Sequence, residues 1–348
     1  MKKIMCAILV VFGIFLGAFQ MHDQAFAAGT GMGFEVYPAQ SDSQVNNKVT
    51  YYDLKLNPGE TTELAIKVKN TSDKPIVVNT AIGKGTTSTS GLGVYNQVDN
   101  KSIDLPYNIE KYVTTKTAKI DLGVGESKKV IYTVKMPDKA FDGVLAGGMT
   151  FLKKADASDK SKGMSIANQF SYTISLVLHG KKDLDKNKVT LGKVKADQLN
   201  GRNAITMPIQ NETAAYLSQV KTNVKVSKKG SDQVLYKQSG EKYQIVPNSV
   251  FNLPVRIGEV KFKAGDYTAN VEVQSKGQKW HFTRDFTITN DEANQLNKTA
   301  LVKEENTWLY ILFACIGIAL LILLFSIIYV RKQRKIKVLK AELEKARE

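Results

Sequence analysis

A run of 23 residues without a charged side chain, 308–330, constrains this chain more than any other feature. As a helix rising about 1.5 Å per residue, it is long enough to cross a hydrocarbon core of about 30 Å. Aromatic side chains stand near both of its ends, where amphipathic rings prefer the headgroup level. The tail that follows, 331–348, carries eight Lys/Arg and three Glu, and positive residues beside a span stay cytoplasmic. We therefore predict one transmembrane helix over 308–330, with 331–348 as a basic cytoplasmic tail. The residues expected at the membrane interface are Trp308, Tyr310, Tyr329, Arg331 and Lys332.

The first 27 residues predict a secretory signal peptide. Lys2 and Lys3 precede an apolar stretch, and small residues follow it at Ala25, Ala27 and Ala28. A positive start, an apolar middle and an A-x-A site are the three parts of such a signal, so we expect cleavage after Ala27. An uncleaved N-terminal anchor is the alternative. Export leaves 28–307 outside the cell, as the extracellular part of a single-pass membrane protein.

Alternation of apolar and polar residues predicts that this exported part is all β. Leu64, Ile66 and Val68 fall on one face of a strand, and Val130 and Tyr132 begin a second such series. Many short runs of this kind, separated by hairpin-length turns, favour β-sandwiches over parallel α/β units. We expect two Ig-like β-sandwich domains in tandem, followed by the single transmembrane helix.

The polar stretch 155–165 has no apolar period and reads as a linker between the two domains. We place the first domain at 28–154 and the second at 166–289, each large enough to bury its own core and fold separately. A further polar stretch, 290–307, reads as a stalk, partly helical, that joins the second domain to the membrane.

The residue inventory argues against catalysis and against metal or cofactor binding. Cys6 and Cys315 both lie in apolar runs, which leaves no thiol in the exported part, and only His179 and His281 stand there. A catalytic site needs a nucleophile, a base or a metal in reach of each other, and no such set is evident. The formal net charge of +16 favours polyanions. Outside the cell these would be wall polymers, since nucleic acid is improbable there.

Several short motifs, taken in their order, give the chain a resemblance to a known family. They are GFEVYP at 33–38, YYDLKLNPG at 51–59, FDGV at 141–144, GGMTF at 147–151, VPNSVFNLPV at 246–255, KAGDY at 263–267 and WHFTRDF at 280–286. Together with the signal, two all-β domains, one span and a basic tail, they resemble the WxL-interacting proteins of Gram-positive bacteria. Departures are Val246, where the family more often has Ala, and Tyr52, where it often has Phe.

The resemblance implies a membrane-anchored, non-enzymatic adaptor at the cell wall. Its first domain would bind peptidoglycan, and its second a secreted WxL surface protein. Tyr51 and Tyr52 are weak candidates for peptidoglycan contact, and Asn248, Ser249 and Phe251 for partner contact; the tyrosine pair and the Pro-Asn-Ser segment fit core and turn positions as well. The alternatives are a chaperone-like assembly factor and a wall tether that binds polyanions without specificity.

Overall fold

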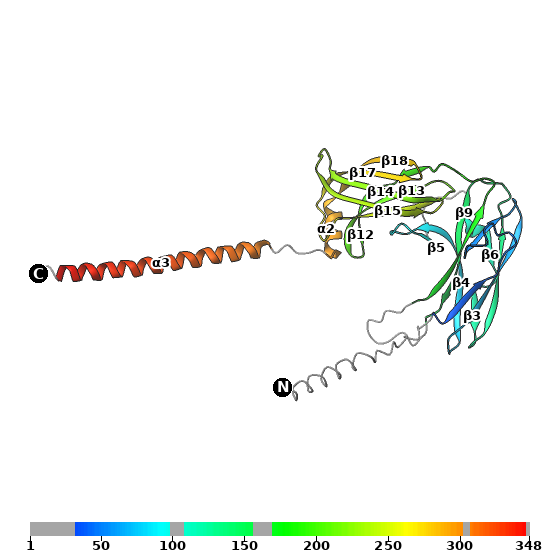
Figure 1. Ribbon diagram of the computed structural model, residues 1–348, viewed down its shortest axis with the longest axis horizontal. Helices are drawn as coiled ribbons and strands as arrows, with labels where there is room; N and C mark the ends of the chain where they lie inside the picture. The colour runs from blue at the N-terminus through cyan, green and yellow to red at the C-terminus, as the bar shows by residue number, and fades with distance from the viewer. Residues whose placement is uncertain (1–31, 98–107, 156–168, 302–306, 346–348) are drawn as a thin grey trace, which may run out of the picture.

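Two groups of β-strands lie side by side, and a long helix, α3, extends away from them (Figure 1). The structure, a computed structural model, describes residues 32–97, 108–155, 169–301 and 307–345. It confirms the prediction of an all-β ectodomain followed by one apolar helix. The signal peptide 1–27, with Ala25, Ala27 and Ala28, lies outside the described residues and stays a prediction.

The first unit is a sandwich of two sheets around one core. One sheet has the order β1-β3-β8-β6, and the facing sheet contains β4, β9, β10 and β2, with β5 and β7 beside β4. The predicted alternation is confirmed, because Leu64, Ile66, Val68, Val130 and Tyr132 are all buried in this core. The elements are β1 (Phe34–Pro38), β2 (Tyr52–Lys55), β3 (Thr61–Asn70), β4 (Ile76–Thr87), β5 (Gly93–Gln97), the 3-10 turn η1 (Ile109–Lys111), β6 (Val113–Thr115), β7 (Lys119–Leu122), β8 (Ser127–Lys135), β9 (Val144–Lys153) and β10 (Ser171–His179).

The second unit is a sandwich with its own core. One sheet has the order β15-β14-β17-β18, and the facing strands are β11, β12, β13 and β16. Its core residues come from 189–293. The elements are β11 (Val189–Leu191), β12 (Lys195–Leu199), β13 (Arg202–Asn211), β14 (Leu217–Lys228), β15 (Val234–Ile245), β16 (Ser249–Arg256), β17 (Gly265–Ser275) and β18 (Gln278–Ile288).

A continuous ten-stranded sheet joins the two units. The connection is a short parallel pairing of β16 with β4, in which Phe251 lies opposite Thr87. Gly148 of β9 lies against the middle of β5, and an added Cβ there would be 2.7 Å from the Tyr95 carbonyl oxygen. Only glycine, which has no Cβ, allows the backbone of β5 to come this close to β9.

The strand β10 follows the expected linker but belongs to the first sandwich. It pairs antiparallel with β9 and parallel with β2, and Ile174, Leu176 and Leu178 are part of the first core. The expected second domain, 166–289, therefore includes one strand that completes its neighbour. Of the expected linker 155–165, residues 156–165 lie outside the described part of the chain.

The expected stalk begins with a helix that is docked on the second unit. Helix α2 (Asn290–Thr299) starts at Thr289, whose hydroxyl accepts from the Glu292 amide at 3.2 Å. Ala293 is buried in the second core, and the Asn297 side chain exchanges hydrogen bonds with the Phe262 backbone at 2.7 and 2.9 Å. Residues 290–299 are thus part of the folded unit.

Helix α3 (Thr307–Lys345) is longer than the predicted span 308–330. Within its segment Ile311–Lys340, the most apolar stretch of 18 residues has a mean hydropathy of 3.1, so the helix is long and apolar enough to cross a membrane. The helix continues into the basic tail because Lys, Arg, Leu, Ala and Glu are good helix formers and no Gly or Pro interrupts them. Tyr329 is exposed and accepts from Gln333 Nε2 at 3.0 Å, and Arg331 and Lys332 follow on the same helix. The side chains of Trp308 and Tyr310 lie outside the described part.

Candidate functional site

The parallel pair β2 and β10 forms the base of the candidate site. Tyr52 and Leu54 point into the first core, as do Leu176 and Leu178 opposite them. Side chains alternate between the two faces of a strand, so the residues between these core positions point outward. Tyr51, just before β2, Asp53 and His179 therefore share the outer face of the sheet.

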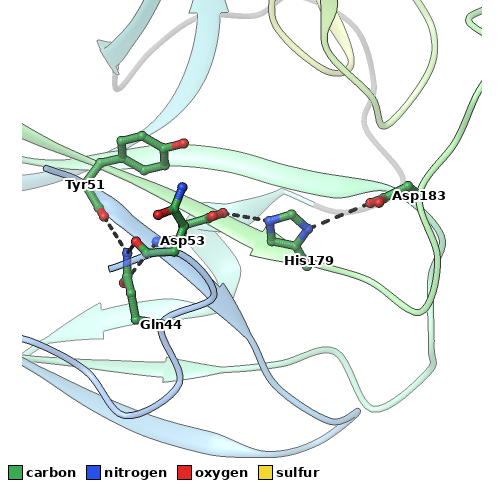
Figure 2. Close-up of polar contacts among 6 residues, drawn as sticks. Gln44, Tyr51, Asp53, His179 and Asp183 are labelled. Carbon is green, nitrogen blue, oxygen red and sulfur yellow. Dashed lines mark hydrogen bonds and ion pairs between the residues drawn. The ribbon is translucent and has the colours of Figure 1, made fainter. Parts of the chain in front are cut away.

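Asp53 and His179 form a hydrogen-bonded pair on this face. Asp53 Oδ1 lies 2.7 Å from His179 Nε2, and the two side chains are 13% and 27% exposed. On the other side of the ring, Asp183 Oδ1 is 3.9 Å from His179 Nδ1 (Figure 2). Both ring nitrogens thus face carboxylates, and in the described part of the chain no hydrogen bond links the ring to Ser175 or Ser218 nearby. The arrangement suits a fixed polar surface and not a nucleophile with its base.

Gln44 fixes the loop that carries Tyr51 (Figure 2). Its side-chain amide donates to the Tyr51 carbonyl oxygen at 3.0 Å and to the Asn46 carbonyl oxygen at 3.0 Å. Its Oε1 accepts from the Asp53 amide at 3.2 Å. Through these bonds the Gln44 side chain connects the segment 44–46 to the start of β2 and fixes the backbone at Tyr51.

Above this face lies a cavity of about 450 Å³, which we call the tyrosine cleft. Its lining comes from both units and consists of Tyr51, Asp53, Tyr95, Val144, Ser175, Val177, His179, Tyr216, Ser218 and Gln244. A few polar groups among aromatic and aliphatic side chains are typical of a site that binds a neutral or mixed small ligand.

The tyrosines of the cleft keep their phenol protons. The Tyr95 and Tyr216 hydroxyls lie 3.1 Å apart. Burial raises the pKa of Tyr216 far above its usual range, and the neighbouring Tyr95 adds to the effect. Burial also raises the pKa of Tyr95 and of Tyr51. At neutral pH all three rings are therefore uncharged, and Tyr51 and one member of the Tyr95–Tyr216 pair have a hydroxyl proton to donate to a ligand.

The second unit is held against the first by a ring of three hydrogen bonds. The Val246 amide donates to Thr87 Oγ1 at 3.0 Å, and Ser249 Oγ donates to the Val246 carbonyl at 2.8 Å. Since the Ser249 proton is used there, Thr87 donates the remaining bond, Thr87 Oγ1 to Ser249 Oγ at 2.8 Å. Thr87 and Ser249 are both buried, so the ring is closed to water.

Glycines allow close backbone contact at the same junction. Gly143 has φ +87°, and an added Cβ would lie 2.0 Å from the Ala214 carbonyl oxygen of the second unit. The neighbouring Val144 amide donates to that oxygen at 2.7 Å. Across the junction, the Gln244 amide donates to the Gly91 carbonyl at 2.8 Å. These contacts place Tyr216, Ser218 and Gln244 over the first unit.

Of the candidate residues for peptidoglycan, only Tyr51 lies in the cleft. It is 38% exposed, whereas Tyr52 is 3% exposed and its hydroxyl donates to the Ala39 carbonyl at 2.8 Å. Sequence reasoning missed Asp53, Tyr95, His179 and Tyr216. For Asp53 a signal existed, since it is two residues beyond Tyr51 on the same face.

Two of the three candidates for partner contact, Ser249 and Phe251, are buried, and Asn248 is half-buried. Ser249 belongs to the hydrogen-bonded ring, and Phe251 is fully buried with its ring 5.0 Å from that of Tyr243. Asn248 has φ +50°, and its amide donates to the Thr213 carbonyl at 3.0 Å. This segment thus turns the chain and packs the core. In the described part of the chain, no group of three or more His, Cys, Asp or Glu side chains is placed to hold a metal ion.

Two family models match the chain and together cover most of it. One is described as WxL Interacting Protein, peptidoglycan binding domain, and matches residues 34–153. The other is described as WxL Interacting Protein, host binding domain, and matches residues 161–298. No curated protein matches the chain.

Solved structures resemble the chain only distantly. The chaperone DraB of E. coli is 13% identical, with 74% of this chain and 98% of that chain covered and a TM-score of 0.27. A chain of the CsuC-CsuE pre-assembly complex of Acinetobacter baumannii is 12% identical, with 72% and 97% covered and a TM-score of 0.30. A chain of the CFA/I chaperone–tip adhesin complex is 13% identical, with 73% and 97% covered and a TM-score of 0.29.

Proposed function

Since the chain belongs to the family of WxL-interacting proteins, we propose that the tyrosine cleft is where it holds peptidoglycan. The chain is a cell-surface adaptor, with a peptidoglycan-binding first domain and a second domain that binds a protein partner. Its partners are peptidoglycan and a WxL surface protein. The proposal concerns the place and the manner of the wall contact.

The single observation that carries the proposal is the make-up of the cleft. Three uncharged tyrosines, two serines, a glutamine amide and the Asp53–His179 pair line one cavity of about 450 Å³. A glycan strand of N-acetylated sugars presents hydroxyls, amides and weakly polar ring faces. Phenol rings cover such faces, and hydroxyls and amides exchange hydrogen bonds with the sugar substituents.

The same make-up favours binding over turnover. The families that match are binding domains. The His179 ring is directed to Asp53 and Asp183, so no general base is positioned beside Ser175 or Ser218. We therefore propose that the adaptor holds peptidoglycan without cleaving it. Incubation with purified peptidoglycan should release no new reducing ends or amines, and release by the unmodified protein would contradict this.

The orientation in the membrane follows from the charge of the tail. Eight Lys/Arg at 331–348 favour a cytoplasmic C-terminus, which leaves both sandwiches facing the wall. External protease on intact, wall-stripped cells should remove the sandwiches and spare the tail. If the sandwiches were protected from the protease, the proposed orientation would be wrong.

The test of the cleft is sedimentation of the full chain, in mild detergent, with purified peptidoglycan. Tyr51→Ala should weaken binding by about 30-fold, the effect of losing about 2 kcal/mol at an aromatic anchor. Tyr37→Ala is the matched control, because Tyr37 is a 44% exposed tyrosine of β1 that does not line the cleft. If Tyr51→Ala and Tyr37→Ala sediment equally with peptidoglycan, the tyrosine cleft is not the binding site.

Salt separates this proposal from a non-specific polyanion tether. Binding by general positive charge should collapse toward 1 M salt, where the Debye length falls to about 3 Å. Binding through the tyrosine rings and the neutral hydrogen-bonding groups of the cleft should persist. Complete loss of binding at high salt in the unchanged protein and in both tyrosine variants would favour the tether.

A further inference from the structure

A second cavity lies at the end of the same sheet face, with a volume of about 540 Å³. Its lining consists of Lys55, Leu56, Asn57, Pro58, Met136, Pro137, Lys139, Ala140, Phe141, Gly180 and Lys181. We call it the lysine pocket. It is made by the first unit and the segment directly after β10.

The pocket continues the tyrosine cleft along both strands. Tyr51, just before β2, and Asp53 and Lys55 on β2 succeed one another at intervals of two residues on the outer face. Next to them, His179 is opposite Lys55, and Lys181 follows two residues later. The Asp53–His179 pair therefore lies at the end of the cleft that is nearest to the lysine pocket, and one ligand can extend from the tyrosines to the lysines.

The charge of the pocket is not compensated by the protein. Lys55, Lys139 and Lys181 are exposed, and none of them forms an ion pair within the described residues. The carboxylates that neighbour them along the chain lie beside other side chains. Asp142 is 3.3 Å from Lys182, Asp138 is 3.7 Å from Lys135, and Asp183 faces His179 at 3.9 Å.

The floor of the pocket is apolar and rigid. Leu56, Met136 and Phe141 are buried beneath it. The Lys181 amide donates to the Phe141 carbonyl at 2.7 Å, and an added Cβ on Gly180 would lie 2.3 Å from the same oxygen. Three ammonium groups above an apolar floor suit an anionic group attached to a short aliphatic chain.

We propose that the lysine pocket binds the C-terminal carboxylate of a short peptide, while the glycan that carries the peptide occupies the tyrosine cleft. The inference rests on the proposed function, because it takes peptidoglycan, a glycan with attached peptides, as the ligand. Asp53 and Asp183 border the cleft and repel an anion there. The carboxylate is thereby directed to the end where Lys55, Lys139 and Lys181 stand, and the ligand has one orientation.

The experiment compares two soluble probes by calorimetry on the full chain in mild detergent. One is a disaccharide–peptide with a free C-terminal carboxylate, and the other is the same molecule with a C-terminal carboxamide. The free acid should bind about 10-fold to 100-fold more tightly, as expected for hydrogen bonds to a charged group. In the triple variant Lys55→Gln, Lys139→Gln and Lys181→Gln, the two probes should bind equally.

A matched triple variant controls for net charge. Lys69→Gln, Lys116→Gln and Lys129→Gln remove the same charge from exposed positions of the first unit that do not line the pocket. This variant should keep the preference for the acid, and thermal melts should show that both triple variants are folded. Loss of the preference in both would mean that only general charge matters and would overturn the pocket assignment.

The outcomes separate the pocket from the cleft. Equal binding of acid and amide by the unchanged protein, with Tyr51→Ala still weakening both, would overturn the lysine pocket and leave the cleft intact. No effect of Tyr51→Ala on either probe would refute the cleft itself. Inorganic polyphosphate is also tested as a competitor for the lysine pocket. If polyphosphate displaces bound peptidoglycan but the free-acid disaccharide–peptide does not, the anion that the pocket binds is a phosphate polymer, and the peptide carboxylate is overturned.

Discussion

Removing the Thr87 hydroxyl should loosen the junction between the two sandwiches. In Thr87→Val the side chain keeps its shape, but the Val246 amide loses the acceptor that now lies 3.0 Å away. Ser249 keeps its bond to the Val246 carbonyl, so the unpaired group is one buried N–H. A buried donor without a partner costs about 1–3 kcal/mol.

This loss should be visible as a lower melting temperature. For chains of 150–250 residues, 1 kcal/mol shifts Tm by about 2–4 °C, which gives a decrease of about 2–12 °C here. The assay is calorimetry and circular dichroism on the exported region 32–301. Since the tyrosine cleft is lined from both units, retention on peptidoglycan should fall in the same variant.

The matched control is Thr150→Val. Thr150 is also a buried threonine, but its hydroxyl lies 3.0 Å from Thr173 Oγ1 within the first unit, and Thr173 is exposed to water. No buried amide loses its acceptor, so the control should change Tm less and leave peptidoglycan retention unaltered. A Tm decrease for Thr87→Val no larger than that for Thr150→Val would refute the role of the ring.

Further predictions test the junction, the shared cleft and the acid stability. Gly143→Ala should lower Tm and speed proteolysis between the units, because the added Cβ would lie 2.0 Å from the Ala214 carbonyl oxygen. Gly125→Ala is the control for backbone strain alone, since Gly125 has φ +71° and no atom lies within 4 Å of an added Cβ. The first unit expressed without the second should sediment with peptidoglycan more weakly than the joined region, and equal binding would show that the second unit's lining is dispensable. The Gly123 amide at 2.7 Å from the Glu126 carboxylate holds the pKa of Glu126 below its usual 4.5. That contribution is present above pH 4.5 and is lost as the pH falls through the lower folded pKa, so Glu126→Ala should reduce Tm at pH 7 and progressively less in acid, as calorimetry across pH would show.

The features that sequence reasoning predicted correctly are those in which neighbours along the chain carry the signal. Alternation in β3 and β8 names Leu64 and Tyr132 as core residues, because successive side chains of a strand point to opposite faces. The charge-free run within α3 predicts a span from its length alone.

The assignment of strands to units required the tertiary structure. A polar stretch at 155–165 reads as the end of a domain, yet β10 returns after it to pair with β9 and β2. A fragment cut at the polar stretch would lose Leu176 and Leu178 from the first core. Composition reports where a chain is polar, and it does not report which sheet edge the next strand completes.

The sequence by itself determined the all-β class, the apolar helix and the family, because periodicity, length and motif order are local properties of the chain. Only the tertiary structure decided the sites. Asp53 and His179 are 126 positions apart and meet because β2 and β10 pair in parallel with one register. Ser249, in a segment that resembles an exposed turn, is buried by Thr87, 162 positions away. Contacts over such distances depend on which strands pair and in what register, and the buried area of the whole fold sets that choice, not any single segment.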